Sequence, residues 1–231
     1  MAVPTLGVVM LETRFPRPPG DVGNAQTFAF PVRYRTVAGA SPRRVVIERD
    51  PALLAPFIDA ARALEREGVA AVTTSCGFLA LFQREMAAAV AVPVWTSSLL
   101  LVAEIEAALR DGRRVGIVTA DAPSLTAGHL RAVGARADTP CEGLALDSRF
   151  RATVLEDRHE LDVGEAERAT VAAAERLVAR HPEVAAIVLE CTNMPPYANA
   201  VRAATGLPVH DITRLLVSRF GIASAVRTAS P

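Results

Sequence analysis

The sequence has no excess of charge of either sign. Its 231 residues carry 25 Lys and Arg against 25 Asp and Glu. A protein that holds nucleic acid or an anionic membrane surface through charge needs a basic field, and the overall balance of this chain supplies none. We therefore expect neither nucleic acid nor a membrane among its partners.

Long hydrophobic runs are also missing. The apolar runs are far shorter than the roughly 20 residues that span a bilayer, although 51% of the residues are hydrophobic. The N-terminus has no basic region followed by a long apolar core, which a secretory signal would show. We expect a cytoplasmic protein with a sizeable core and no membrane segment.

Cysteine is scarce, with three residues and no CxxC spacing. This scarcity argues against a disulfide framework and against a zinc site. We expect free thiols, no bound metal and no cofactor.

Two short stretches, 69–78 and 184–193, share one pattern. Each begins with Val-Ala-Ala, continues as an apolar run and ends in small polar residues that include a cysteine. Cys76 and Cys191 each lie seven residues after that valine and seventeen before a Pro-Val pair, and they are 115 residues apart. The pattern is typical of a buried parallel strand that carries a reactive side chain to the carboxyl edge of an α/β sheet.

The strand that opens the chain is repeated as well. Residues 6–12 match residues 115–121, glycine on glycine and acid on acid, at an offset of 109. The second half has therefore gained six residues before its cysteine. Strands that alternate with helices predict parallel sheets and right-handed crossovers. We expect an α/β protein of two pseudo-symmetric Rossmann-like (flavodoxin-like) lobes, each a parallel sheet flanked by helices, with the active site between them.

The same repeat predicts how the chain divides. Residues 1–97 and 210–231 should form lobe 1, and residues 98–209 should form lobe 2. The helix expected at 98–109 would cross into the second lobe, and the one at 212–226 would return to the first. Other expected strands lie at 5–10, 30–37, 92–95 and 141–146, and other expected helices at 53–67, 79–89, 122–133 and 163–180.

A loop rich in proline and glycine follows the first strand, at 11–24. Such residues prevent regular structure, and the loop leaves the edge of the sheet where ligands bind in this kind of fold. The loop is either a simple connection or a ligand contact. In the second case Asn24 is the expected binding residue.

The duplication predicts that Cys76 and Cys191 face each other across a cleft. Two thiols on opposite sides of one carbon suit racemisation, in which one removes a proton and the other returns it. A helix start after each cysteine would help to lower the thiol pKa. A single buried cysteine is more often a small core residue, but two at equivalent strand ends favour function. Cys141 has no counterpart in the repeat and is interpreted as structural.

Small polar residues near the two cysteines are candidates for binding a carboxylate. Ser75, Thr192 and Asn193 can donate hydrogen bonds, and Gly77 allows the backbone to approach a ligand closely. Thr119 ends the strand in the second half that repeats the first strand of the chain, and it is a further candidate for binding the carboxylate.

Other ionisable residues carry weaker signals. His129 is expected on the surface, and His210 is expected to be structural rather than to orient the site. Glu12 and its repeat partner Asp121 either touch the cleft or cap a helix. Glu190 should raise the pKa of the neighbouring thiol unless its side chain points away.

These motifs resemble those of the aspartate/glutamate racemase superfamily, which includes hydantoin racemases, maleate isomerases and arylmalonate decarboxylases. Residues 74–77 (Thr-Ser-Cys-Gly) look like its first motif, and residues 190–195 (Glu-Cys-Thr-Asn-Met-Pro) look like its second. The resemblance covers essentially the whole chain. It implies cofactor-independent proton transfer by Cys76 and Cys191, a small-molecule carboxylate substrate bound by nearby polar residues, and a homodimer or larger homo-oligomer.

The chain departs from the glutamate racemases of that superfamily at several positions. They carry Asp-Ser after the first strand where this chain has Leu11 and Glu12, and a histidine where it has Asn193. Their first motif continues Cys-Asn-Thr, whereas Gly77 and Phe78 follow the cysteine here. Phe78 predicts a more apolar pocket wall and is a further candidate contact. Glutamate is therefore not the expected substrate.

The leading hypothesis is a cofactor-independent racemase or epimerase of an amino acid or a related α-substituted carboxylate or hydantoin. Both cysteines are present, which favours this activity because the superfamily's decarboxylases keep only the second. One alternative is a lyase or isomerase resembling maleate isomerase or arylmalonate decarboxylase, in which a single cysteine acts. Another is a small-molecule binding protein without catalysis.

Overall fold

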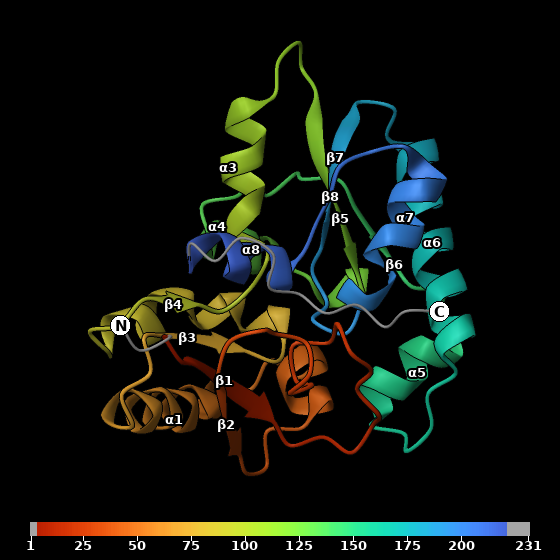
Figure 1. Cartoon of the computed structure of the whole chain (residues 1–231). Coiled ribbons are helices and arrows are strands. Elements are labelled where there is room, and N and C mark those ends of the chain that lie inside the picture. Colours follow the sequence, from red (N-terminus) through yellow and green to blue (C-terminus); the bar gives the residue numbers. More distant parts are fainter. Residues whose placement is uncertain (1–3, 221–231) are drawn as a thin grey trace.

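The computed structural model describes residues 4–220 and contains two β-sheets (Figure 1). Each sheet has four strands, and the order β2-β1-β3-β4 in the first is repeated as β6-β5-β7-β8 in the second. All of these pairings are parallel, so the predicted pair of α/β lobes is confirmed. The strands are β1 (Leu6–Leu11), β2 (Val32–Val37), β3 (Ala71–Thr74), β4 (Val94–Trp95), β5 (Arg114–Thr119), β6 (Cys141–Gly143), β7 (Val184–Leu189) and β8 (Val209–His210).

Helices follow the strands and flank both sheets (Figure 1). The α-helices are α1 (Leu54–Arg66), α2 (Gln83–Ala88), α3 (Leu100–Ala108), α4 (Ala127–Ala132), α5 (Arg149–Glu156), α6 (Val163–Arg180), α7 (Ala198–Thr205) and α8 (Ile212–Arg219). Shorter helical segments are η1 (Arg43–Ile47), η2 (Pro51–Leu53), η3 (Gly77–Phe82), η4 (Ala122–Ser124) and η5 (Pro195–Tyr197).

The glycine repeated in the central strands lets a helix pack closely on each sheet. A Cβ atom at Gly7 would lie 3.1 Å from the Leu64 side chain of α1, and one at Gly116 would lie 2.7 Å from Leu177 of α6. Contacts this short leave no room for a side chain. The sequence repeat therefore corresponds to one packing arrangement used twice.

Two helices cross between the lobes. In α3, Val102 packs in one core cluster with Val115 of β5, so this helix belongs to the second sheet. In α8, Leu215 packs in another cluster with Val8 of β1, on the first sheet. The end of the second expected helix, 221–226, lies outside the described residues.

Helix α5 and the turn η1 are not predicted by the sequence analysis. Ser148 begins α5 by accepting a hydrogen bond from the Arg151 backbone at 3.2 Å, and Phe150 and Val154 are buried. Although α5 follows a strand of the second sheet, it lies beside the first lobe and contacts η1 (Figure 1). This segment closes one side of the cavity described below.

His129 is buried, so the predicted surface position is wrong. Its Nδ1 accepts a hydrogen bond from the Thr126 backbone at 3.1 Å, which completes a capping box at the start of α4. Its ring meets the Phe78 ring edge to face, with centroids 5.3 Å apart. Burial lowers the pKa of His129 to about 4, so the ring is neutral at neutral pH.

Candidate active site

Both repeated cysteines line one cavity, which with the open space at its mouth has a volume of about 360 Å³. Cys76 follows β3 and Cys191 follows β7, and each thiol is buried. The geometric prediction that the two thiols lie in one cleft is therefore confirmed, while their part in catalysis stays a prediction. Much of the remaining lining is apolar and includes Leu11, Phe15, Pro42, Val46, Val154 and Leu155.

The loop that carries Cys76 is held by hydroxyl groups of the residues before it. The Ser75 Oγ accepts a hydrogen bond from the Leu11 backbone at 2.9 Å. The Thr74 Oγ1 donates to the Thr96 carbonyl at 2.7 Å, which fixes the end of β3. Cys76 itself has extended backbone angles and stands immediately before η3. The polar residues after the strand therefore set the position of the thiol.

The thiol of Cys191 has a polar partner in its own motif. Its Sγ donates to the Asn193 Oδ1 at 3.4 Å, and its carbonyl accepts from the Met194 backbone at 3.0 Å. Thr192 between them reaches the other lobe, because its Oγ1 donates to the Ser75 carbonyl at 2.7 Å. The two cysteine motifs are thus joined directly.

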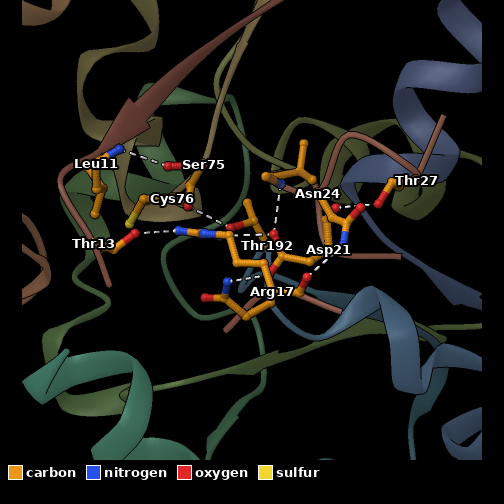
Figure 2. A network of polar contacts seen from close by, with 12 residues as sticks. Leu11, Thr13, Arg17, Asp21, Asn24, Thr27, Ser75, Cys76 and Thr192 are labelled. Carbon is orange, nitrogen blue, oxygen red and sulfur yellow. Dashed lines mark hydrogen bonds and ion pairs between the residues drawn. The ribbon is translucent and has the colours of Figure 1, made fainter. Parts of the chain in front are cut away.

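The loop after β1 supplies a second connection, centred on Asp21 (Figure 2). This buried carboxylate accepts from the Asn193 amide at 2.6 Å, from the Arg17 guanidinium at 2.9 Å and from the Gly23 backbone at 2.7 Å. Arg17 lines the cavity and also donates to the Thr13 Oγ1 at 3.1 Å. The loop is therefore part of the site.

Both thiols are protonated at neutral pH in this structure. Burial raises the pKa of Cys76 to about 12, and the nearby Glu190 carboxylate adds to the effect. Burial and the same carboxylate raise the pKa of Cys191 well above its usual range. The backbone N–H groups of Phe78 and Leu79 act in the opposite direction on Cys76. A thiolate therefore forms here only if a bound molecule changes this balance.

Glu190 is fully buried and also lines the cavity. Its Oε2 accepts from the Thr119 Oγ1 at 2.7 Å, whereas its Oε1 has no hydrogen-bond partner among residues 4–220. Burial raises the pKa of Glu190 to about 7. The carboxyl does not point away from the thiols, and it opposes their ionisation.

Most of the predicted binding residues line the cavity, namely Ser75, Gly77, Phe78, Thr192 and Asn193. Two others do not. Asn24 donates to the Arg17 carbonyl at 2.6 Å and accepts from the Gln26 backbone, so it shapes the loop. Thr119 is completely buried behind the cavity and holds Glu190. Both residues hold neighbouring groups of the site in position.

The acids at the ends of β1 and β5 also lie outside the lining. Glu12 accepts a hydrogen bond from the Gly39 backbone at 2.8 Å. Asp121 is buried and forms an ion pair with Arg151 of α5 at 2.5 Å. His210 is partly buried at the end of β8 and does not line the cavity. Glu12 and Asp121 therefore hold a loop and a helix in place.

Sequence reasoning missed Asp21 and Arg17. A loop of irregular structure has no periodicity from which inward-pointing residues can be recognised. The available signal was an opposite-charge pair four residues apart in a loop at the ligand-binding edge of the sheet.

In residues 4–220, no group of three or more His, Cys, Asp or Glu side chains could hold a metal ion. Nor is any helix of that part of the chain both long and apolar enough to cross a membrane.

The family model for Asp/Glu/hydantoin racemases matches residues 48–220 of this chain. Among characterised relatives, the dimethylsulfoniopropionate lyase of Durusdinium sp. clade D is 35% identical over 215 residues, covering 90% of this chain and 71% of that protein. Dimethylsulfoniopropionate lyase 3 of Emiliania huxleyi (strain CCMP1516) is 34% identical over 222 residues, covering 90% of this chain. The present chain spans only 57% of the length of that second relative.

Solved structures of similar fold include unliganded arylmalonate decarboxylase, with a TM-score of 0.64, 21% identity and coverage of 98% of this chain and 96% of that one. Glutamate racemase from Aquifex pyrophilus gives a TM-score of 0.55 at 15% identity, covering 94% of this chain and 83% of that one. At these identities the likeness concerns the fold.

Proposed function

Because this chain belongs to the Asp/Glu/hydantoin racemase family, we propose that it is a cofactor-independent lyase that uses a cysteine as base, with dimethylsulfoniopropionate as substrate. The observation that carries the proposal is the placement of Cys76 and Cys191 on one cavity, in a chain more than a third identical to a lyase of that substrate over 90% of its length. The racemase, put first by the sequence analysis, becomes the second candidate.

The proposed reaction is an elimination that needs one base. The substrate carries a carboxylate, two CH₂ groups and a dimethylsulfonium group. A thiolate removes a proton from the carbon next to the carboxylate, and the electron pair of that C–H bond becomes the new double bond. The carbon–sulfur bond breaks, and its electrons leave with neutral dimethyl sulfide. The products are acrylate and dimethyl sulfide, and the thiol returns its proton to water.

Cys76 is the better candidate for the base. Two backbone N–H groups, those of Phe78 and Leu79, favour its thiolate. Only one backbone N–H, that of Asn193, acts in this direction on Cys191, whose proton is directed to the Asn193 side-chain oxygen at 3.4 Å, which favours the thiol form. We assign the removal of the proton to Cys76, and to Cys191 a hydrogen bond to the developing negative charge.

The substrate carboxylate can be bound by Arg17 and by neighbouring donors. The guanidinium lines the cavity, and the Ser75 hydroxyl accepts from a backbone N–H, so its own proton is free to point elsewhere. A planar guanidinium suits a carboxylate, because it offers paired N–H donors. The wall of Leu11, Phe15 and Val46 would face the apolar part of the substrate.

The racemase remains as second candidate because the cavity contains two thiols. Elimination of a neutral leaving group requires only one base, whereas inversion at a carbon requires an acid or base on each side. A cavity that binds a small carboxylate without catalysis is the third possibility, and it predicts ligand binding that survives replacement of both cysteines.

The test is product analysis with the purified protein. We expect dimethyl sulfide in the headspace and equimolar acrylate by NMR when dimethylsulfoniopropionate is added. Cys76→Ser should abolish both products, and Cys191→Ser should slow them. The same protein in D₂O with amino acids or hydantoins tests racemisation through deuterium at the α carbon. Deuterium exchange without any release of dimethyl sulfide would overturn the lyase in favour of the racemase.

A further inference from the structure

The Glu190 carboxylate is buried in the site without a cation. Its exposed fraction is 0%, one oxygen accepts from Thr119, and the other accepts no hydrogen bond among residues 4–220. No Arg or His side chain in that part of the chain forms an ion pair with it. A buried carboxylate in this state carries a large desolvation cost, which an approaching positive charge would offset.

This carboxyl lies where the two cysteine loops meet. A Cβ atom at Gly77 would lie 2.2 Å from its Oε1 and 2.3 Å from the Glu190 carbonyl oxygen, so only glycine fits at position 77. Glu190 precedes Cys191 in sequence, and Gly77 follows Cys76. Because Glu190 lines the same cavity as the two cysteines, a molecule bound between the thiols lies near this residue.

Without a neighbouring cation, the negative charge of Glu190 would hinder ionisation of the proposed base, Cys76. Burial raises the pKa of both Cys76 and Cys191 and the Glu190 carboxylate raises it further, whereas elimination requires a thiolate. A substrate that brings its own positive charge into the cavity reverses the effect, because the cation neutralises the carboxylate and favours the thiolate. The Glu190 carboxylate therefore disfavours reaction of a substrate whose side group is neutral or anionic, and it favours reaction of a substrate whose side group is cationic.

We propose that Glu190 determines specificity by selecting carboxylate substrates that carry a fixed positive charge, such as a sulfonium. The inference rests on the proposed function for the identity of that charge. A sulfonium donates no hydrogen bonds, so it needs a negative field and an apolar surface rather than polar partners. The cavity provides Glu190 beside Phe78, whose ring can also face a cation, and Arg17 provides the opposite charge for the substrate carboxylate.

Two unreactive ligands of equal shape test this directly. The cation 3-(trimethylammonio)propanoate and the neutral-tailed 4,4-dimethylpentanoate differ only in nitrogen or carbon at the branched atom. The dissociation constant of each is measured by calorimetry at pH 8, with the wild type and with Glu190→Gln, which keeps the shape and an acceptor for Thr119. We expect the preference for the cation to fall at least about tenfold in the variant. The ratio of the two dissociation constants is compared between the wild type and the variant, so the difference in hydration between the two ligands cancels.

A matched control removes a different carboxylate, that of Glu12, which follows β1 at the carboxyl-terminal edge of the first sheet. Glu12→Gln should leave the preference within about twofold, because Glu12 accepts from the Gly39 backbone and does not line the cavity. An unchanged preference in a correctly folded Glu190→Gln protein would overturn the inference. If the wild type releases dimethyl sulfide but the preference does not change, the function stands and the inference fails. If the preference falls but no lyase activity exists, the inference stands for another cationic carboxylate.

A measurement on the wild type covers the case in which the variant does not fold. The Glu190 carboxyl is followed by ¹³C NMR against pH in the complex with each ligand, and its midpoint should be lower with the cation. The thiols that face it do not interfere, because burial raises the pKa of Cys76 and Cys141 to about 12 and that of Cys191 well above its usual range. Arg17 and Asp21 are common to both complexes. Equal midpoints would contradict the proposal.

Discussion

The Asp21 carboxylate accepts a hydrogen bond from the Asn193 side chain at 2.6 Å, although the two residues are 172 positions apart. Asn193 in turn accepts the Cys191 thiol proton at 3.4 Å. One buried acid in the first lobe therefore fixes the amide that orients the thiol of the second. The same acid pairs with Arg17, so two cavity residues depend on it.

Replacing Asp21 with asparagine should damage both stability and activity. The change removes the negative charge that pairs with the Arg17 guanidinium, of which only 10% of the side chain is exposed, and puts an NH₂ group in place of the carboxylate oxygen that Asn193 contacts. Breaking a buried pair in this way costs about 3–5 kcal/mol. Because Asn193 also loses its acceptor, we expect kcat/KM to fall by about 10- to 100-fold. Urea denaturation and product assays measure the two effects.

The matched control is Glu67→Gln, which removes a carboxylate paired with Arg33 and Arg35 on the surface. Exposed pairs contribute about 1 kcal/mol or less, so this variant should retain its stability and activity. An Asp21→Asn protein that behaves like Glu67→Gln would show that the loop after β1 has no part in the site.

Thr192→Val tests the direct connection between the cysteine motifs. The substitution keeps the side-chain shape but removes the donor that reaches the Ser75 carbonyl at 2.7 Å. An unsatisfied buried carbonyl costs about 1–3 kcal/mol. We also expect kcat to fall, because the two thiol loops are no longer joined.

Thr170→Val is the corresponding control within a single helix. Its hydroxyl is also buried and donates to the Ala166 carbonyl at 2.7 Å inside α6, away from the cavity. It should leave kcat within about twofold. Equal losses of kcat in the two variants would contradict a special role for the connection between the motifs.

Gly77→Ala should be severely destabilising. Its Cβ would lie 2.2 Å from the Glu190 Oε1 and 2.3 Å from the Glu190 backbone oxygen, and the backbone atom cannot move aside cheaply. Overpacking of this kind costs about 1–3 kcal/mol or more. The free energy of unfolding and the release of product should both fall.

Gly164→Ala also replaces glycine with alanine, but we expect it to raise the free energy of unfolding rather than to lower it. In α6 the added methyl would lie 3.2 Å from the flexible end of Arg168 and in ordinary van der Waals contact with the Asp162 side chain at 3.6 Å. Alanine in a helix is favoured over glycine by about 0.5–1 kcal/mol, so stability should rise slightly. If Gly77→Ala were equally well tolerated, the close packing of the two cysteine loops would be disproved.

The duplicated parts of the fold could be predicted from sequence, because each element supported the interpretation of its counterpart. Gly7 and Gly116 fixed the equivalence of β1 and β5, and the repeated motifs placed Cys76 and Cys191 on one cavity. A hydrophobic pattern that occurs once is ambiguous evidence for a strand or helix. The same pattern repeated in the second half of the chain is much stronger evidence.

The parts that were missed are those in which the two halves differ. Helix α5 has no counterpart in the first half, where η1 occupies the corresponding place after β2. It nevertheless supplies Val154 and Leu155 to the cavity. Arg17 and Asp21 lie in a loop whose shape depends on contacts with Asn193, far away in sequence. Neither the repeat nor local periodicity contains this information, because both positions are set by tertiary packing.

Glu190 should make the wild type less stable as the pH rises from about 4.5 to 7. Burial raises the pKa of this carboxyl from 4.5 to about 7 in the folded state. In that interval the unfolded chain has lost the proton and the folded chain retains it. The folded state therefore binds more protons, and the free energy of unfolding falls with pH. The shift corresponds to roughly 3 kcal/mol, and the loss is complete above pH 7.

Urea denaturation of the wild type and of Glu190→Gln across pH 4.5–8 measures this contribution, because the other carboxyl groups cancel in the difference. We expect the variant to gain stability relative to the wild type steadily up to pH 7 and to keep a constant advantage above it. A difference that does not vary with pH would mean that Glu190 ionises normally in the folded protein. Burial without a cation would then not raise the free energy of ionising Glu190. The proposed selection of a positively charged substrate depends on that cost.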